Sequence, residues 1–279
     1  MSRIERALEK AAQRRQQSVT EPAESLSPPP PPSEPEESRQ AVEPSFDEMF
    51  SVEPVKVSNP KLVALNKKDD VAFEEYNKLR SQVVRLTQGE KFQNVLMVTS
   101  CIGEEGKSLT SLNLAISMAR SYDNTVLLVD TDFRRPTLHQ SLGLEPETGL
   151  IHCLRDNQPI GKALIKTGIG KLVFLPAGGA INNPVEMLES KRMQEIIREL
   201  KTRYPERYVI FDTPPILPFA DAQVLAKKVD GVLFVVREGR TRISEIKRAM
   251  HTLQGSNLLG IVYNDARVSM SKKSHYYYS

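Results

Sequence analysis

Residues 99–110 of the 279-residue chain, TSCIGEEGKSLT, contain the residue types that bind nucleotide phosphates. A lysine between a glycine and a hydroxyl residue reaches the β- and γ-phosphates, and the hydroxyl is a Mg²⁺ ligand. Lys107 and Ser108 hold these places, whereas Cys101 stands where the usual pattern G-x-x-x-x-G-K-[ST] has its first glycine. We therefore expect ATP and Mg²⁺ to bind at a loop made of Gly103, Glu104, Glu105, Gly106, Lys107, Ser108 and Leu109.

Aspartates close two further apolar stretches. Asp130 ends TVLLVD at 125–130 and is followed by Asp132, and Asp212 ends YVIFD at 208–212. The carboxyl ends of parallel strands form the edge at which open α/β sheets bind ligands, so these carboxylates are expected beside the loop. One aspartate alone would be read as a helix cap, but these two strand ends together with the one that carries Lys107 and Ser108 favour a catalytic set of Lys107, Asp130, Asp132 and Asp212.

We assign Mg²⁺ to Ser108 of the loop and to Asp130 and Asp212 of this set, directly or through bound water. A remaining carboxylate would accept the proton of an attacking hydroxyl group. The residue types leave open which of Asp130 and Asp132 accepts that proton.

Alternating strands and helices position these segments. Short apolar runs predict strands over 94–100, 125–130, 171–175, 208–212, 231–236 and 258–263. Helical periodicity predicts helices over 71–86, 108–120, 184–203, 219–228 and 243–253. This alternation is typical of an α/β fold in which a parallel sheet is flanked by helices on both faces.

The flanking segments differ in composition from this core. Residues 1–17 have helical spacing of apolar residues, which predicts a short amphipathic helix that is either frayed or a docking peptide. Residues 18–60 are rich in proline, glutamate and serine, with five prolines at 28–32, and predict a disordered, extended linker. The folded domain is expected over 61–264, followed by a flexible tail at 265–279 that ends in Tyr276, Tyr277 and Tyr278.

Overall composition argues against several classes of protein. The formal net charge is only +3 and no basic stripe is apparent, so a nucleic-acid partner is not expected. Two cysteines are too few for a disulfide framework, and the longest apolar runs are too short to span a bilayer. These features predict a cytoplasmic protein with reduced thiols, which would need a partner to work at a membrane.

Several segments resemble the bacterial tyrosine kinases (BY-kinases) of polysaccharide assembly. LLVDTDFRRP at 127–136 and YVIFDTPPILPFADA at 208–222 are similar to the second and third motifs of that family. LPAGGAINNPVEML at 175–188, LLGIVYND at 258–265 and the terminal tyrosines extend the resemblance over about 70–279. The N-terminal SRIERALEKA and the proline-rich linker resemble the stand-alone kinases of exopolysaccharide loci, especially those beside exosortase-type sorting systems.

The resemblance implies a P-loop NTPase fold of the deviant-Walker, MinD/ParA-like kind. It also implies ATP-dependent autophosphorylation of Tyr276, Tyr277 and Tyr278 between the subunits of a homo-oligomer. The implied activator is a membrane polysaccharide co-polymerase, or chain-length determinant, which would recruit the kinase to the inner face of the plasma membrane. The pair would control exopolysaccharide chain length and export.

Three positions depart from the family pattern. Glu104 replaces a glycine of the family loop, which would cost about 1–2 kcal/mol of strain if the position requires a positive φ. Asn77 replaces the middle arginine of the E-x-x-R-x-x-R helix that forms subunit contacts in the family, so assembly is expected to be weaker or to use other contacts. The tyrosine cluster, with three residues, is also short.

Two other functions share much of this pattern. A ParA/MinD-like positioning ATPase would carry a signature lysine five residues before Lys107, where this chain has Ile102. A non-catalytic ATP-binding adaptor remains open, because Glu104 and Asn77 are departures that an inactive relative would tolerate.

Overall fold

The computed structural model describes residues 53–66, 71–203 and 206–267. The helix predicted over 1–17, most of the linker predicted over 18–60 and the tyrosines of the tail lie outside these residues. All of the residues that form the predicted phosphate and carboxylate sites lie within them.

A seven-stranded sheet forms the centre of the domain, in the order β3-β4-β2-β5-β1-β6-β7. Its strands are β1 (Val95–Ser100), β2 (Thr125–Asp130), β3 (Ile165–Lys166), β4 (Leu172–Leu175), β5 (Arg207–Asp212), β6 (Gly231–Arg237) and β7 (Leu258–Asn264). Six of these were predicted. The sheet is not purely parallel, because β3 pairs antiparallel with β4, and a strand of two residues leaves no periodicity to detect.

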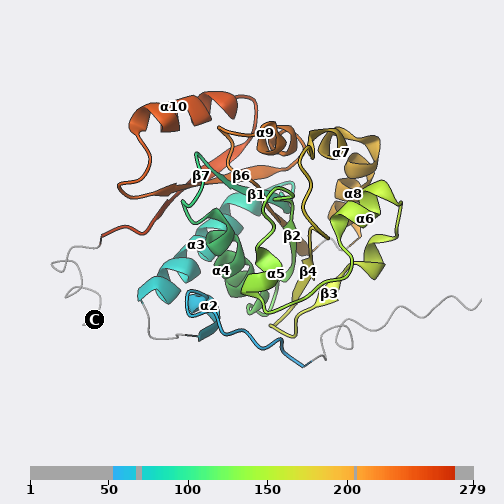
Figure 1. Ribbon diagram of the computed structural model, residues 1–279. Coiled ribbons are helices and arrows are strands. Elements are labelled where there is room, and N and C mark those ends of the chain that lie inside the picture. The colour runs from blue at the N-terminus through green and yellow to red at the C-terminus, as the bar shows by residue number, and fades with distance from the viewer. Residues whose placement is uncertain (1–52, 67–70, 204–205, 268–279) are drawn as a thin grey trace, which may run out of the picture. The chain divides into compact units, whose positions relative to one another are not determined.

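Helices cover both faces of this sheet (Figure 1). One apolar cluster joins the sheet to α2 (Val63–Asn66), α3 (Val71–Thr87), α4 (Lys107–Ala119) and α5 (Leu138–Ser141). A second cluster joins its other face to α6 (Leu150–Arg155), the 3-10 turn η1 (Ile160–Lys162), α7 (Val185–Glu189), α8 (Lys191–Thr202), α9 (Ala220–Ala226) and α10 (Ile243–Thr252). The predicted α/β architecture with helices on two faces is therefore confirmed.

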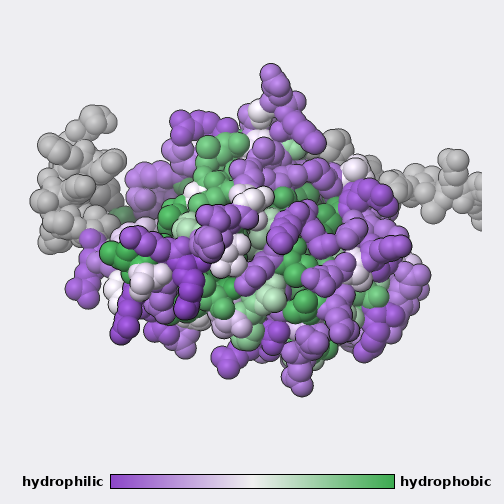
Figure 2. Space-filling model, turned by 90° about the horizontal axis from the view of Figure 1, so that it is seen from above, coloured by the Kyte–Doolittle hydropathy of each residue, from purple (hydrophilic) through white to green (hydrophobic). Residues whose placement is uncertain are grey.

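Burial explains the continuous apolar runs. Every residue of β1, β2, β4 and β5 is buried, as expected for parallel strands that are covered on both faces. The edge strand β7 is more exposed, with Ile261 at 53% and Tyr263 at 59%. Polar side chains dominate the surface seen from above, with apolar atoms showing between them, as is ordinary for a folded domain (Figure 2). No helix among the described residues is long and apolar enough to cross a bilayer.

The helix predicted over 184–203 is interrupted at Ser190. This residue has an extended backbone, with φ −56° and ψ 154°, and its hydroxyl accepts a hydrogen bond from the Met193 amide at 3.1 Å. Serine is a favoured N-cap because its side chain satisfies an amide that has no partner within the helix. Ser190 therefore ends α7 and begins α8, which apolar periodicity alone did not reveal.

The last part of the predicted linker lies against the domain. The Val55 amide donates to the Thr167 carbonyl oxygen at 2.9 Å, and the side chains of Val55 and Val57 pack against one apolar cluster. The alternation of Val55 and Val57 with polar residues places both valines on one side of an extended chain. The boundary predicted at residue 60 thus falls inside a segment that already contacts the core.

Candidate active site

The loop between β1 and α4 turns sharply at Gly106, which has a φ of 90° and begins the helix. This backbone conformation requires glycine, and a Cβ atom here would lie 2.1 Å from Asn264 Nδ2 and displace that side chain. The first amides of a helix have no partner within the helix and point outward at its positive end. The start of α4 is therefore suited to bind phosphate, as the sequence predicted.

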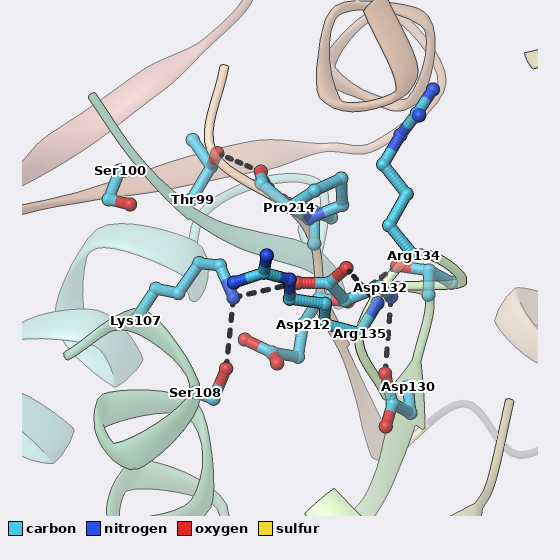
Figure 3. A network of polar contacts seen from close by, with 12 residues as sticks. Thr99, Ser100, Lys107, Ser108, Asp130, Asp132, Arg134, Arg135, Asp212 and Pro214 are labelled. Atoms are coloured by element: carbon cyan, nitrogen blue, oxygen red, sulfur yellow. Dashed lines mark hydrogen bonds and ion pairs between the residues drawn. The ribbon is translucent and has the colours of Figure 1, made fainter. Parts of the chain in front are cut away.

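The carboxylates meet at this loop because of the strand order. β2 and β5 are neighbours, and their register places Asp130 directly opposite Asp212. Lys107 Nζ lies 3.0 Å from Asp132 Oδ2 and 3.1 Å from Ser108 Oγ. The predicted set of Lys107, Ser108 and three aspartates thus gathers around one space (Figure 3).

Backbone contacts fix the positions of the aspartates. Asp130 Oδ1 accepts a hydrogen bond from the Asp132 amide at 3.1 Å, and Asp132 Oδ1 accepts one from the Arg135 amide at 3.1 Å. The Thr131 hydroxyl donates to the Asp212 carbonyl oxygen at 2.6 Å, joining the ends of the two strands. Asp132 Oδ2 thus stays available to Lys107, whereas Asp130 Oδ2 accepts a further hydrogen bond from the Leu138 amide at 3.4 Å.

Ser111 belongs to the site and was not predicted. Its hydroxyl lies 2.9 Å from Asp212 Oδ1 and 3.0 Å from the Lys107 carbonyl oxygen. It follows Lys107 by four residues, and this spacing puts both residues on the same face of α4. A search along that helix face would have found it.

The charges of the site are unbalanced. Three carboxylates surround one ammonium group, and burial together with the neighbouring charges of Asp212 and Asp132 raises the pKa of Asp130 well above its usual value. Burial also raises the pKa of Asp212, although Lys107 partly offsets this. Burial acts to lower the pKa of Lys107, but the carboxylates outweigh it, so the net shift is upward and the lysine stays charged at neutral pH.

This excess of negative charge fits a divalent cation. Among the described residues no three His, Cys, Asp or Glu side chains are grouped so as to hold a metal ion. Mg²⁺ needs no such cage, because it binds through one or two protein oxygens together with nucleotide phosphates and water. Ser108, Asp130 and Asp212 fit that kind of site.

Replacing Asp130 with asparagine should stabilise the nucleotide-free protein at neutral pH. A carboxyl group whose pKa is raised by folding destabilises the fold above that raised pKa, and the penalty fades as the pH falls toward its ordinary value. We expect Asp130→Asn to raise the Tm by about 2–4 °C for each kcal/mol of relieved penalty. The difference from the unmodified protein should shrink as the pH is lowered toward the ordinary aspartate pKa of 3.8 in differential scanning calorimetry. A difference that grew on acidification would contradict this assignment.

The two loop glutamates have different environments. Glu104 has a φ of 64°, so the family glycine is replaced at a position that does require a positive φ. Its side chain is 78% exposed, whereas Glu105 is fully buried. The Glu105 carboxylate accepts hydrogen bonds from the Ile102 amide at 2.9 Å and from the Thr241 hydroxyl. The Glu105 side chain therefore stabilises the loop through these hydrogen bonds, and only the backbone of this residue is available to a phosphate.

Cys101 also lies under the loop. It is fully buried, and burial together with the Glu105 charge raises the pKa of its thiol to about 12. A neutral thiol thus fills the place of the missing first glycine. Both cysteines are free and buried, as expected for reduced thiols.

The arginines after β2 have separate environments. Arg134 forms a bidentate ion pair with Asp221, at 2.7 and 3.1 Å, and lies 4.2 Å from the Phe219 ring centre. It fastens the loop after β2 to the start of α9 and is not free for phosphate. Arg135 points toward the same side of the site as Lys107 in Figure 3.

Asn77 contacts another helix of its own domain. Its Oδ1 accepts a hydrogen bond from the Ser117 hydroxyl at 3.1 Å, and Arg80 Nη1 donates to the Ser117 carbonyl oxygen at 3.1 Å. Both residues fasten α3 to α4. The position at which the family carries the middle arginine thus serves packing within this domain.

Comparison with known proteins agrees with this geometry. Residues 96–276 match the family model of the CobQ/CobB/MinD/ParA nucleotide binding domain. The chain is 34% identical over 218 residues to tyrosine-protein kinase YwqD of Bacillus subtilis, covering 77% of this chain and 90% of that protein. The chain belongs to the bacterial tyrosine kinases. The predicted family and the predicted P-loop NTPase fold are therefore confirmed.

Other relatives of this BY-kinase are similar over the same domain. The solved kinase domain of Escherichia coli tyrosine kinase ETK is 30% identical, with a TM-score of 0.67, covering 75% of this chain and 82% of that one. The succinoglycan biosynthesis transport protein ExoP of Rhizobium meliloti is 32% identical over 221 residues, which are 70% of this chain but only 27% of ExoP. MinD of Pyrococcus horikoshii, solved with Mg-ADP, has a TM-score of 0.52 over 65% of this chain and 76% of that one; at 19% identity it shares only the fold.

Proposed function

We propose that this BY-kinase transfers the γ-phosphoryl group of ATP to Tyr276, Tyr277 and Tyr278 of a second copy of the chain. The convergence of Lys107, Asp130, Asp132 and Asp212 beside the phosphate-binding loop is the observation that supports this most strongly. The terminal tyrosines supply hydroxyl groups of the right chemistry for such a transfer.

The residues of the site have different roles in this reaction. The start of α4 and Lys107 bind the β- and γ-phosphates. Bound Mg²⁺ would neutralise phosphate charge, and Ser108, Asp130 and Asp212 would hold it directly or through water. Asp132 accepts the tyrosine proton as Oη bonds to the γ-phosphorus. The bond from that phosphorus to the bridging oxygen breaks, and ADP leaves with the electron pair.

Asp132 suits the role of base better than Asp130 does. Its side chain keeps 8% exposure and contacts Lys107, so an incoming hydroxyl group can reach it. Asp130 is fully buried and lies behind it, where a metal ligand or an outer-sphere contact is expected. Phosphoryl transfer needs mainly positioning and charge compensation, and this arrangement supplies both.

The tail is long enough to reach a neighbour. From Asp265, which follows β7, to Tyr276 is eleven residues, which span at most about 36–40 Å when extended. Lys272, Lys273 and His275 precede the tyrosines, and their charge favours approach to the acidic site. Transfer between copies in a homo-oligomer is thus geometrically feasible.

A membrane protein of polysaccharide assembly would complete the system. The resemblance to the stand-alone kinases of exopolysaccharide loci and the name of the relative ExoP support an activator of the co-polymerase or chain-length-determinant kind. Such a partner would hold the kinase at the inner face of the plasma membrane. The kinase would there control chain length and export.

Positioning ATPases and inactive adaptors are less well supported. Ile102 occupies the place of the signature lysine, and its amide is bound to Glu105, so this position supports the loop through its backbone. A positioning ATPase also has no use for a tyrosine cluster as acceptor.

A mixing experiment tests transfer between copies. A Lys107→Met chain keeps the tyrosines but lacks the loop lysine, and a Tyr276→Phe/Tyr277→Phe/Tyr278→Phe chain keeps the site but lacks acceptors. Incubated together with ATP, Mg²⁺ and the activator's cytosolic segment, only the Lys107→Met chain should gain mass in steps of one phosphate. ATP turnover with no phosphate on either chain would favour a positioning ATPase, and no turnover would favour an adaptor.

A further inference from the structure

Glu104 is held by an arginine that lies far away in the sequence. Arg240 Nη2 lies 2.5 Å from Glu104 Oε2, and Arg240 Nε donates to the Gly103 carbonyl oxygen at 3.3 Å. One guanidinium group thus bridges two consecutive residues of the phosphate-binding loop. Its planar, multiply donating shape is needed for this, because a lysine ammonium group has no such fork.

Arg240 is carried by a segment that is itself fastened to the loop. The Thr241 hydroxyl and the Arg237 amide both donate to the buried Glu105 carboxylate, and Asn264 Nδ2 donates to the Glu105 carbonyl oxygen at 2.9 Å. Residues 238–242 connect the end of β6 to α10, so this segment and Arg237 before it form a second support for the loop. The ion pair is partly exposed, but its arginine is anchored on both sides along the chain.

Glu104 has two unfavourable features that this contact offsets. Its left-handed backbone conformation is unfavourable for a residue with a Cβ. Its carboxylate also adds negative charge to a loop that binds phosphates, where like charges repel. Arg240 restrains the backbone conformation of Glu104 and neutralises the charge of its carboxylate.

We propose that Arg240 is a positioning residue that keeps the phosphate-binding loop competent for nucleotide despite Glu104. This deepens the proposed function and rests on it for the identity of the ligand. Arg240 and Glu104 are a matched pair: the arginine matters only while the glutamate is present.

A double-mutant cycle tests the pairing. The variants are Arg240→Ala, Glu104→Gly and the double variant, with the exposed Arg242→Ala as a matched control from the same segment. Binding of Mg-ATP is measured by calorimetry at low salt. We expect Arg240→Ala to raise Kd about three- to tenfold, and the rise to shrink at high salt because the pair is exposed. In the Glu104→Gly background the same substitution should change Kd by less than about twofold.

Two further measurements, of ATP turnover and of Tm, complete the test. In turnover, the loss should fall on the KM for ATP more than on kcat, as expected for a binding defect. Without nucleotide, Arg240→Ala should lower the Tm of the unmodified chain but not that of the Glu104→Gly chain. Equal effects in both backgrounds, or none in either, would overturn the pairing. If the unmodified chain bound no Mg-ATP, the proposed function would fail, while the Tm cycle would still test whether Arg240 holds the loop.

Discussion

Lys107→Met should reduce tyrosine phosphorylation at least about a hundredfold, since removing one preformed charge contact to a transferring phosphoryl group typically costs that much. Lys107 is nearly buried and is held between Asp132 and Ser108, so no other cation of the loop can replace it. Methionine keeps an unbranched side chain as far as Cε and removes the ammonium group with its charge and its hydrogen bonds. Phosphate gained per chain, read as intact mass over time, measures the effect.

The control for this variant is Lys162→Met, an exposed lysine at the end of η1. It should phosphorylate at the rate of the unmodified protein. Because Lys107 also compensates the carboxylates, Lys107→Met should lower the Tm of the nucleotide-free protein as well. A Lys107→Met protein that kept a tenth or more of the rate would rule out the assigned role.

Asp132→Asn should lower the rate by about a hundredfold or more, the usual contribution of a general base. Asparagine can still accept the Arg135 amide, so the local backbone should stay in place. Binding of Mg-ATP should not weaken, because Lys107 loses a competing ion pair and is freed for phosphate. The loss should therefore appear in kcat with little change in the Kd of Mg-ATP.

Asp123→Asn, in the exposed turn between α4 and β2, is the matched control and should change neither quantity. Asp130→Asn offers a contrast. If Asp130 is a metal ligand, this variant should lose its dependence on Mg²⁺ and its affinity for the nucleotide together. If Asp132→Asn kept its rate and Asp130→Asn lost it without losing affinity, the roles of the two aspartates would be exchanged.

Much of the site was predictable because its residues lie at the ends of strands. Asp130 and Asp212 end continuous apolar runs, and the parallel arrangement brings such ends together without knowledge of the strand order. The loop lysine and serine were recognisable for the same reason, between a buried strand and a helix. Strand boundaries agreed to within about a residue, because burial on both faces keeps such runs apolar throughout.

The missed features depend on contacts between distant residues or on single side chains. Arg240 is 136 residues away from Glu104, and no local pattern connects them. The break between α7 and α8 at Ser190 depends on one side-chain hydroxyl, which the periodicity of apolar residues does not reveal. The burial of Glu105 could not be predicted either, because a glutamate in a loop is expected to be exposed unless its hydrogen-bond partners are known.

The most direct test of the central claim is intact mass after incubation with ATP and Mg²⁺, with and without the activator's cytosolic segment. The unmodified protein should gain up to three phosphates, and the variant with Tyr276, Tyr277 and Tyr278 replaced by phenylalanine should gain none. Phosphate on the phenylalanine variant, or ATP consumption by the unmodified protein with no gain in mass under either condition, would contradict a kinase that modifies its own terminal tyrosines.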